Sequence, residues 1–385
     1  MRRTAFRPAA LVSLCLTAVL LAACVPSANG TSGSARPSGS GSGTVSSPPA
    51  PAKVADPWQP GDPQLGAQVL WYAGNETDAT VRAKALRVVD YMVGKDMNSL
   101  AISFPFGTRA PQANEVAATA ATPSVRHLAI LMDVAAAAGL RITLRPLLDE
   151  RTLMAEDPLA WRGSLAPTDR DAWFRSYESF LAPYLSLAAR HHARTFVIGA
   201  ELTSLEDDSR WRGIVSAAGK LFPGEISYDA NWDDYVSRRI SLPVNHLGVD
   251  AYFPLKTLGD DASVSAIVAG WQKWLDRKST GKLPRILLSE VGIPAEDGAY
   301  HHPGVWRDAG KPLNLAVQKT WFAAACQVAR DRDMAGLYWW NIDFHADPAA
   351  ADPRTDVHSS FLGRPAESAI TSCFRAWAAS ASGDR

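Results

Sequence analysis

The sequence has few cysteines and no excess of charge of either sign. Only four of its 385 residues are cysteine, and no spacing of cysteine and histidine is typical of a metal site. The 39 basic residues balance 39 acidic ones, and no basic stripe indicates a nucleic-acid partner. We therefore expect no metal, no other cofactor and no nucleic acid.

Long apolar runs are missing, and the one near the N-terminus is too short to span a bilayer comfortably as a mature helix. It covers Ala9–Ala23, behind an arginine-containing start. Its end, Leu21-Ala22-Ala23-Cys24, resembles the lipobox of bacterial lipoproteins, where the chain is cut before the cysteine and the cysteine is lipidated. An ordinary signal peptide with a chance cysteine is the alternative. We predict a signal peptide over residues 1–23, a lipid on Cys24 and an extracytoplasmic protein anchored to the cell membrane.

Residues that could build a core are scarce in the next segment. Ser, Gly, Pro, Ala and Thr dominate from Val25 to about Pro57, which predicts a disordered tether over residues 24–57. The remaining residues, 58–385, contain no internal linker, and their number fits a single catalytic domain. We expect this domain to act as a monomer.

Two cysteines remain after Cys15 is removed with the signal peptide and Cys24 is lipidated. Cys326 and Cys373 lie in the last part of the chain, and an oxidising compartment allows them to pair. A disulfide between the last two long helices and a pair of buried free thiols are both consistent with the sequence.

The folded part alternates between short apolar runs and Ala-rich amphipathic segments, which indicates strands alternating with helices. The expected strands are Gln68–Tyr72, Ser99–Phe104, Arg141–Leu148, Thr195–Glu201, Ile226–Asn231, Leu247–Phe253, Arg285–Glu290 and Gly336–Asn341. The clearest expected helices are Thr77–Val93, Ser124–Ala138, Arg170–His192, Ala262–Arg277 and Leu315–Arg332. This alternation predicts an α/β fold of the (β/α)8 TIM-barrel type. An open doubly wound sheet is the alternative, but the first strand is not followed by a Gly-rich GxGxxG turn.

Side chains suited to carbohydrate gather at the predicted strand ends, where TIM barrels carry their chemistry. Aromatic rings stack on the apolar faces of sugars, and Asn, Asp and Arg bind the hydroxyl rims. Trp232 and Trp340 follow the fifth strand and end the eighth, so we predict that both contact substrate. Arg145 and Asn231 are predicted as polar contacts for the same reason.

Two glutamates close apolar runs that indicate buried strands. Glu201 ends F-V-I-G-A-E, and Glu290 ends R-I-L-L-S-E. Strand alternation places each on the same face as the residues two and four positions before it, so both are expected to face the barrel mouth. A separation of about 5–5.5 Å would be the geometry of a retaining glycosidase. A capping or salt-bridged role is the alternative for either glutamate alone.

The predicted duties of the two carboxylates differ. Glu290 attacks the anomeric carbon, while Glu201 first donates a proton to the leaving oxygen and then takes one from water. A cation or hydroxyl beside Glu290 would keep it ionised. Arg145 and Tyr252 are the candidates.

Four short motifs resemble glycoside hydrolase family 113, whose characterised members are chiefly endo-β-1,4-mannanases. They are I-G-A-E-L at Ile198–Leu202, Y-D-A-N-W at Tyr228–Trp232, S-E-V-G at Ser289–Gly292 and Y-W-W-N at Tyr338–Asn341. The resemblance covers nearly all of the chain after the tether. It implies that Glu201 is the acid/base, that Glu290 is the nucleophile and that Tyr252 hydrogen-bonds the nucleophile. It also implies that Trp340, or its neighbour Trp339, lies under the sugar that is cleaved.

One position departs from the wider group of retaining TIM-barrel glycosidases. Many members carry Asn before the acid/base, where it binds the sugar 2-hydroxyl, but this chain has Ala200. We expect Asn231 to supply that contact. The predicted substrate is β-1,4-mannan, with another β-linked glycan (a glucan, xylan or galactan) as the alternative. A catalytically inactive carbohydrate-binding lipoprotein is the alternative from another class.

Overall fold

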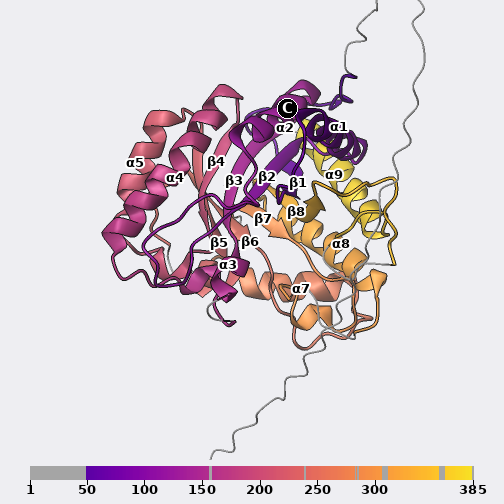
Figure 1. Cartoon of the computed structure of the whole chain (residues 1–385). Coiled ribbons are helices and arrows are strands. Elements are labelled where there is room, and N and C mark those ends of the chain that lie inside the picture. Colours follow the sequence, from indigo (N-terminus) through magenta and orange to yellow (C-terminus); the bar gives the residue numbers. More distant parts are fainter. Residues whose placement is uncertain are drawn as a thin grey trace, which may run out of the picture. The chain divides into compact units, whose positions relative to one another are not determined.

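A computed structural model gives the fold (Figure 1) and describes residues 49–155, 158–237, 240–281, 283, 286–305, 311–354 and 360–383. The predicted signal peptide, Cys24 and residues 24–48 of the predicted tether lie outside the described residues. Within the described ranges, no helix combines the length and apolar character needed to cross a membrane.

Eight parallel strands form a closed barrel in chain order, with the last strand paired to the first. They are β1 (Gln64–Leu70), β2 (Ser99–Phe106), β3 (Arg141–Leu148), β4 (Thr195–Ala200), β5 (Glu225–Asn231), β6 (His246–Asp250), β7 (Leu287–Val291) and β8 (Gly336–Asp343). The predicted (β/α)8 fold is confirmed. The limits differ most at β1, which begins at Gln64 rather than Gln68, and at β6, which ends at Asp250 rather than Phe253.

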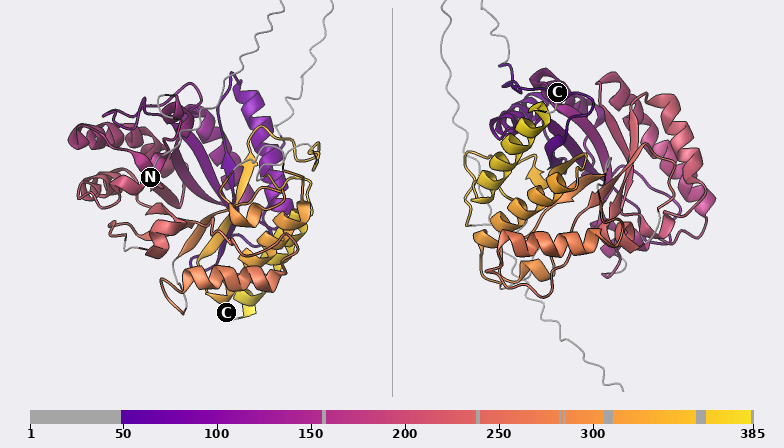
Figure 2. Two further views of the ribbon diagram at one scale, coloured as in Figure 1. Left: turned by 90° about the horizontal axis from the view of Figure 1, so that it is seen from below. Right: turned by 180° about the vertical axis from the view of Figure 1, so that it is seen from behind.

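Helices surround the barrel, as Figures 1 and 2 show. The α-helices are α1 (Asp78–Gly94), α2 (Val125–Ala138), α3 (Glu150–Met154), α4 (Arg170–Arg190), α5 (Trp211–Leu221), α6 (Trp232–Ser237), α7 (Val264–Leu275), α8 (Leu315–Asp331) and α9 (Ala366–Gly383). Among the described residues there are also short 3-10 helices: η1 (Arg162–Ser164), η2 (Thr203–Leu205) and η3 (Ala299–His301). Side chains cap several of the long helices; for example, Asp169 accepts a hydrogen bond from the backbone N–H of Ala172 at the start of α4.

The main hydrophobic core lies between the strands and the helices, and the inside of the barrel is more polar. Two small apolar clusters are separate from the main core: one consists of Ala101, Leu287 and Tyr338, and the other contains Trp340 and Ala200. Buried charged and polar side chains from other strands fill much of the remaining interior. This polar interior is where the candidate site is built.

The segment before β1 contacts the barrel domain, within the range that composition predicts as a tether. The backbone N–H of Ala52 donates to the carboxylate of Asp90 at 2.7 Å, and that of Val54 donates to the carbonyl of Ala138 at 2.9 Å. The compact unit accordingly begins at Pro49. Both bonds use backbone N–H groups of the segment, which its composition does not reveal.

Cys326 in α8 and Cys373 in α9 form a disulfide, with their Cα atoms 5.9 Å apart. Both cysteines are buried. The bond joins the last two helices of the fold, so the structure contains the first of the two arrangements that the sequence allows.

Candidate active site

A cavity of about 280 Å³ opens among the ends of the strands and contains both predicted catalytic glutamates. Its walls come from segments far apart in the chain. It is lined by Glu150, Trp161, Arg162, Glu201, Asn231, Trp232, Tyr252, Glu290, Pro303, Gly304 and Trp340. Of the other predicted site residues, Asn231, Trp232, Tyr252 and Trp340 line this cavity, and Arg145 does not.

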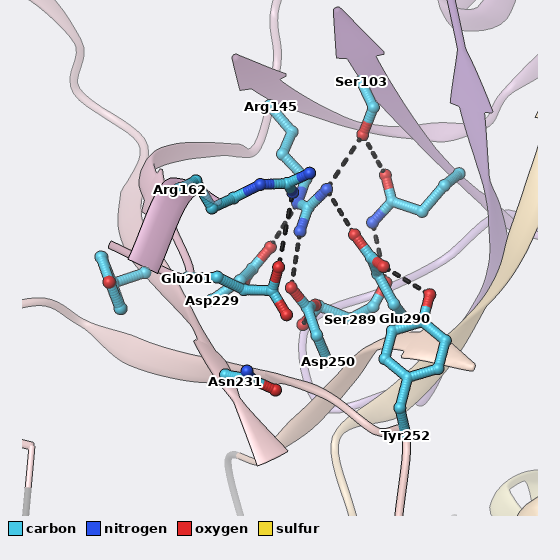
Figure 3. Close-up of polar contacts among 12 residues, drawn as sticks. Ser103, Arg145, Arg162, Glu201, Asp229, Asn231, Asp250, Tyr252, Ser289 and Glu290 are labelled. Carbon is cyan, nitrogen blue, oxygen red and sulfur yellow. Dashed lines mark hydrogen bonds and ion pairs between the residues drawn. The ribbon is translucent and has the colours of Figure 1, made fainter. Parts of the chain in front are cut away.

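Glu290 is held at both carboxylate oxygens (Figure 3). Its Oε1 lies 2.7 Å from Nη1 of Arg145, and the hydroxyl of Tyr252 donates to Oε2 at 2.6 Å. The glutamate side chain is only 6% exposed. Arg145 and Tyr252 therefore lie where the sequence predicts a cation and a hydroxyl beside Glu290.

Arg145 lies behind Glu290, which corrects its predicted contact with substrate. Its side chain has no exposed surface, and it forms ion pairs with Asp229 at 2.6 Å and Asp250 at 2.9 Å as well as with Glu290. Burial opposes the charge of Arg145, but Asp250, Glu290 and Asp229 together raise its pKa well above the ordinary value. Its guanidinium is enclosed by carboxylates, and Arg145 does not line the cavity.

A buried hydrogen-bond network supports this arrangement from the other strands. Ser289 donates to Asp250 at 2.8 Å, the Gln68 amide donates to the carbonyl of Ser289 at 2.8 Å, and Ser103 donates to Gln68 at 2.8 Å. Burial raises the pKa of Asp229, and burial together with the nearby Glu290 raises that of Asp250 well above its usual range. The barrel interior thus gathers several acids around one guanidinium and fixes the nucleophile candidate rigidly.

Glu201 follows the last residue of β4 in a backbone conformation that is uncommon for a side-chain-bearing residue. Its φ is 54°, in the left-handed region. Its N–H donates to the carbonyl of Asp229 at 2.8 Å, and the next residue, Leu202, donates to the hydroxyl of Tyr228 at 2.8 Å. Strained backbone of this kind persists where neighbouring structure enforces it, often at functional sites.

The environment of Glu201 favours its protonated form. Burial raises its pKa from 4.5 to about 7; Arg162 opposes this rise and the charge of Glu290 adds to it. A carboxyl with a pKa near neutrality can both donate and accept a proton. The two glutamates therefore differ in setting: Glu290 is bound by a cation and a hydroxyl, and Glu201 is placed where it holds a proton.

Glu290 does not reach the cavity by the simple alternation that the sequence predicts. Leu288, expected on the same face, packs in the core between strands and helices, whereas Leu287 joins the cluster inside the barrel. The pairing register of β7 shifts between Leu288 and Val291. This irregularity turns the Glu290 side chain inward next to Ser289, as β-bulges beside active sites do.

The same correction applies to Glu201. A Cβ on Gly199, expected on its face, would meet the rings of Tyr228 and Trp211, which belong to the outer core. The register of β4 also shifts, between Val197 and Ala200. The positive φ of Glu201 completes the change of direction.

Comparison with known proteins assigns the chain to a family. The sequence profile described as Glycoside Hydrolase Family 113 matches residues 71–360. The chain belongs to glycoside hydrolase family 113. It is thus a glycoside hydrolase, and the predicted family is confirmed.

Solved structures of this family share the fold. A structure described as a complex of a family 113 β-1,4-mannanase has a TM-score of 0.69 at 19% identity, covering 82% of this chain and 99% of that one. The β-mannanase AaManA from Alicyclobacillus acidocaldarius, solved in complex with ManMIm, has a TM-score of 0.67 at 20% identity, covering 82% and 98%. No curated protein sequence matches the chain.

The aromatic residues of this family 113 glycoside hydrolase divide into cavity wall and core. Trp340 lines the cavity, whereas Trp339 stacks on Phe322 of α8 with ring centroids 4.4 Å apart. Trp232 also lines the cavity and packs edge-on against Trp274 at 5.0 Å. Of the two neighbouring tryptophans in β8, Trp340 is therefore the one that lines the cavity.

Asn231 lies at the end of β5 and lines the cavity. Its side-chain oxygen accepts a hydrogen bond from the N–H of Trp232 at 2.8 Å. Ala200 instead packs with Trp340, Leu70 and Leu147, and its methyl group offers no hydrogen bond to a sugar.

Sequence reasoning missed the part of the wall that loops contribute. Trp161, Arg162 and Glu150 come from the segment between β3 and α4, and Pro303 and Gly304 come from the segment after β7. A strand-end search cannot find such residues. The W-R-G sequence at Trp161 places an aromatic side chain next to a cationic one, which is a weak local indication of a binding site.

No metal centre emerges from the described part of the chain, where no three His, Cys, Asp or Glu side chains group as metal ligands. The acids around Arg145 are held by a guanidinium instead.

Proposed function

We propose that this glycoside hydrolase is a retaining β-mannanase in which Glu290 is the nucleophile and Glu201 the acid/base. The observation that carries the proposal is the pair of glutamates lining one cavity in unequal surroundings. Arg145 and Tyr252 bind the Glu290 carboxylate, and burial raises the pKa of Glu201 to about 7. One group suited to attack and one suited to donate a proton are what double displacement requires.

The first step forms a covalent intermediate. A Glu290 oxygen attacks the anomeric carbon, the bond from that carbon to the glycosidic oxygen breaks, and the leaving oxygen takes the proton of Glu201. In the second step Glu201, now ionised, removes a proton from water as the water attacks the same carbon. The ester bond to Glu290 breaks and the sugar leaves with its original anomeric configuration.

The charges of the site fit this cycle. Glu290 is one of the groups that raise the pKa of Glu201. When Glu290 is esterified its negative charge is lost, so the pKa of Glu201 falls and the carboxylate is ready to act as a base. Arg145 faces Glu290 throughout and favours its departure as a carboxylate.

Mannan is the substrate class that the family and its solved members favour, since the structures matched are described as β-mannanases. We propose that Trp340 and Trp232 contact sugar faces, because both line the cavity. Asn231 supplies the contact to the sugar 2-hydroxyl that Ala200 cannot make. Its side-chain oxygen accepts from the N–H of Trp232, and its amide NH₂ is the group that donates to the sugar.

Hydrolysis of a panel of β-linked polysaccharides by the wild type, Glu290→Gln and Glu201→Gln tests this function. We expect mannan to be cleaved fastest. We expect kcat to fall in each variant by about 10²-fold to 10⁴-fold, the contribution typical of general acid–base catalysis, or by more. Glu178→Gln, on the exposed face of α4, is the matched control. Near wild-type rates in either site variant would refute the assignment, and faster cleavage of a glucan, xylan or galactan would change the substrate.

Azide provides a second test of the acid/base. A small anion can enter the space left by Glu201→Ala and attack the glycosyl intermediate without a general base. On an aryl β-manno-oligoside whose phenolate leaves without a proton, rescue of this variant by azide is expected, with a β-glycosyl azide as product.

We also propose that the enzyme is anchored outside the cytoplasm through a lipid on Cys24. The support is the sequence Leu21-Ala22-Ala23-Cys24 behind an apolar segment. Membrane fractionation of the full chain and of Cys24→Ser tests it. Wild type in the membrane fraction and the variant in the soluble fraction are expected; equal partition of the two would contradict the proposal.

A further inference from the structure

Arg162 is a buried cation beside Glu201 that comes from a loop and not from a strand end. Its Nη1 lies 3.4 Å from Oε2 of Glu201, and its Nε lies 3.0 Å from Oε1 of Glu150. The arginine side chain is only 9% exposed and lines the cavity. Figure 3 shows the side chain of Arg162 pointing toward Glu201; Arg162 belongs to η1, whereas Arg145 belongs to β3.

A cation this close to an acid/base creates a conflict. A full ion pair would keep Glu201 ionised, yet the first step needs its proton. Glu150 lies nearer to Arg162 than Glu201 does, and it also accepts from the Arg162 backbone N–H at 3.4 Å. The guanidinium is therefore shared, and only part of its attraction acts on Glu201.

The loop that carries Arg162 is fixed relative to Glu201. The Ser164 hydroxyl donates to the carbonyl of Trp161 at 2.7 Å, and Gly163 lies so close to the Trp161 ring that a Cβ would overlap it. The hydroxyl of Ser204, in the segment just after Glu201, donates to the carbonyl of Leu165. The first two contacts hold the loop in shape, and the third joins it to the segment after Glu201. Together they fix the distance from Arg162 to Glu201.

We propose that Arg162, shared between Glu150 and Glu201, is a positioning residue that sets when the acid/base holds its proton. This inference rests on the proposed role of Glu201. In the first step Glu150 draws Arg162 away from Glu201 and the proton stays. In the second step the charge of Glu290 is gone, and Arg162 stabilises the Glu201 carboxylate that takes a proton from water.

Other charged and titratable groups also act on Glu201, from several elements. Glu290 of β7 and Glu150 of α3 raise its pKa, whereas Arg162 of η1 and Arg145 of β3 lower it. The carboxyl of Asp250 and the hydroxyl of Tyr252 interact with Glu201 electrostatically as well. Arg162 is the cation with the larger effect on Glu201, and it can be changed without removing the support of the nucleophile.

The test is the pH dependence of kcat/KM on an unactivated β-1,4-manno-oligosaccharide. Its alkaline limb reports the proton of the acid/base in the free enzyme. Loss of Arg162 in Arg162→Met raises the pKa of Glu201, so the alkaline limb moves up by about one pH unit. Loss of the Glu150 charge in Glu150→Gln moves it down, and Arg162→Lys restores it towards the wild type. Arg126→Met, in an exposed ion pair with Asp78, is the matched control and leaves the limb in place.

Opposite shifts in Arg162→Met and Glu150→Gln support the proposal, because a merely structural defect lowers the rate without moving the limb in two directions. If Arg162→Met fails to fold, the other two variants test the proposal. A downward shift of the alkaline limb in Glu150→Gln, with no shift in Arg126→Met, then supports it. An unmoved limb in folded variants, together with azide rescue of Glu201→Ala, overturns the role of Arg162 and leaves the proposed function standing. Failure of azide rescue overturns the role of Glu201, and the role of Arg162 with it.

Discussion

Glu201 and Glu290 are chemically identical side chains that their neighbours make different. Arg145 and Tyr252 contact the two oxygens of Glu290, while Glu201 is buried next to that negative charge with a shared cation at 3.4 Å. The sequence predicts that both glutamates face the barrel mouth, and it predicts Arg145 and Tyr252 as the partners of Glu290. It does not predict Arg162, because the position of a loop residue depends on how the whole segment between β3 and α4 packs.

Tyr252→Phe tests the support of the nucleophile. Burial and then Glu290 raise the pKa of the Tyr252 hydroxyl well above its ordinary value, so it stays protonated and donates to Glu290. Loss of a hydrogen bond to a charged group costs about 1.5–3 kcal/mol, which predicts a fall in kcat of roughly 10-fold to 100-fold. Tyr91→Phe, which loses a similar bond to Glu367 in α9, is the control and should keep its rate. A Tyr252→Phe rate within about twofold of the wild type would show that this bond is unimportant.

The raised pKa of Glu201 also predicts a cost in stability. The unfolded carboxyl has a pKa of 4.5 and the folded one about 7, so the folded state binds the proton more tightly. Stability is full below pH 4.5 and falls as the pH rises through 7. Glu201→Gln is neutral at every pH and escapes this loss, which amounts to at most about 3 kcal/mol.

Urea unfolding at pH 5 and pH 8 measures that cost. The free energy of unfolding of Glu201→Gln should exceed that of the wild type more at pH 8 than at pH 5. Glu178→Gln, whose carboxyl is exposed, should show no such difference. An equal difference at both pH values would mean that Glu201 titrates normally in the folded protein.

At the scale of elements, the sequence predicts which segments are strands and helices but not how strands bend. The hydrophobic period is a local signal, so β3 is predicted with the limits that it has. The register shifts in β4 and β7 come from pairing between strands, which no single run of residues contains. The face of each glutamate was predicted by alternation, and alternation fails at these two points. The glutamates face the cavity because irregular backbone turns them there.

The disulfide between α8 and α9 is predicted to stabilise the C-terminal part of the barrel. It closes a loop with a sequence separation of 47, for which loop-closure entropy corresponds to about 4 kcal/mol. The double variant Cys326→Ser, Cys373→Ser should lose up to this amount in free energy of unfolding and keep its activity under native conditions, because neither residue lines the cavity. Unfolding in urea with and without reductant, for the wild type and the variant, measures the loss. Identical curves for all samples would show that the bond contributes nothing.

At the scale of the whole molecule, one barrel brings residues from many strands and loops to one cavity. Arg145, Glu201, Tyr252 and Glu290 are far apart in the sequence and converge because parallel strands end on the same side of a closed barrel. Family membership explains the fold and the class of reaction. The arrangement of charges inside the barrel is what assigns the proposed duties of the two glutamates.

Covalent trapping tests the central claim most directly. In a 2-deoxy-2-fluoro-β-mannosyl fluoride, the 2-fluorine slows both steps and the anomeric fluoride is a good leaving group, so a retaining β-glycosidase accumulates its glycosyl intermediate. Mass spectrometry of the digested wild-type enzyme should place the fluorosugar on Glu290, and Glu290→Gln should carry no label. A label on another residue, or full hydrolysis of mannan by an enzyme that is never labelled, would contradict the account.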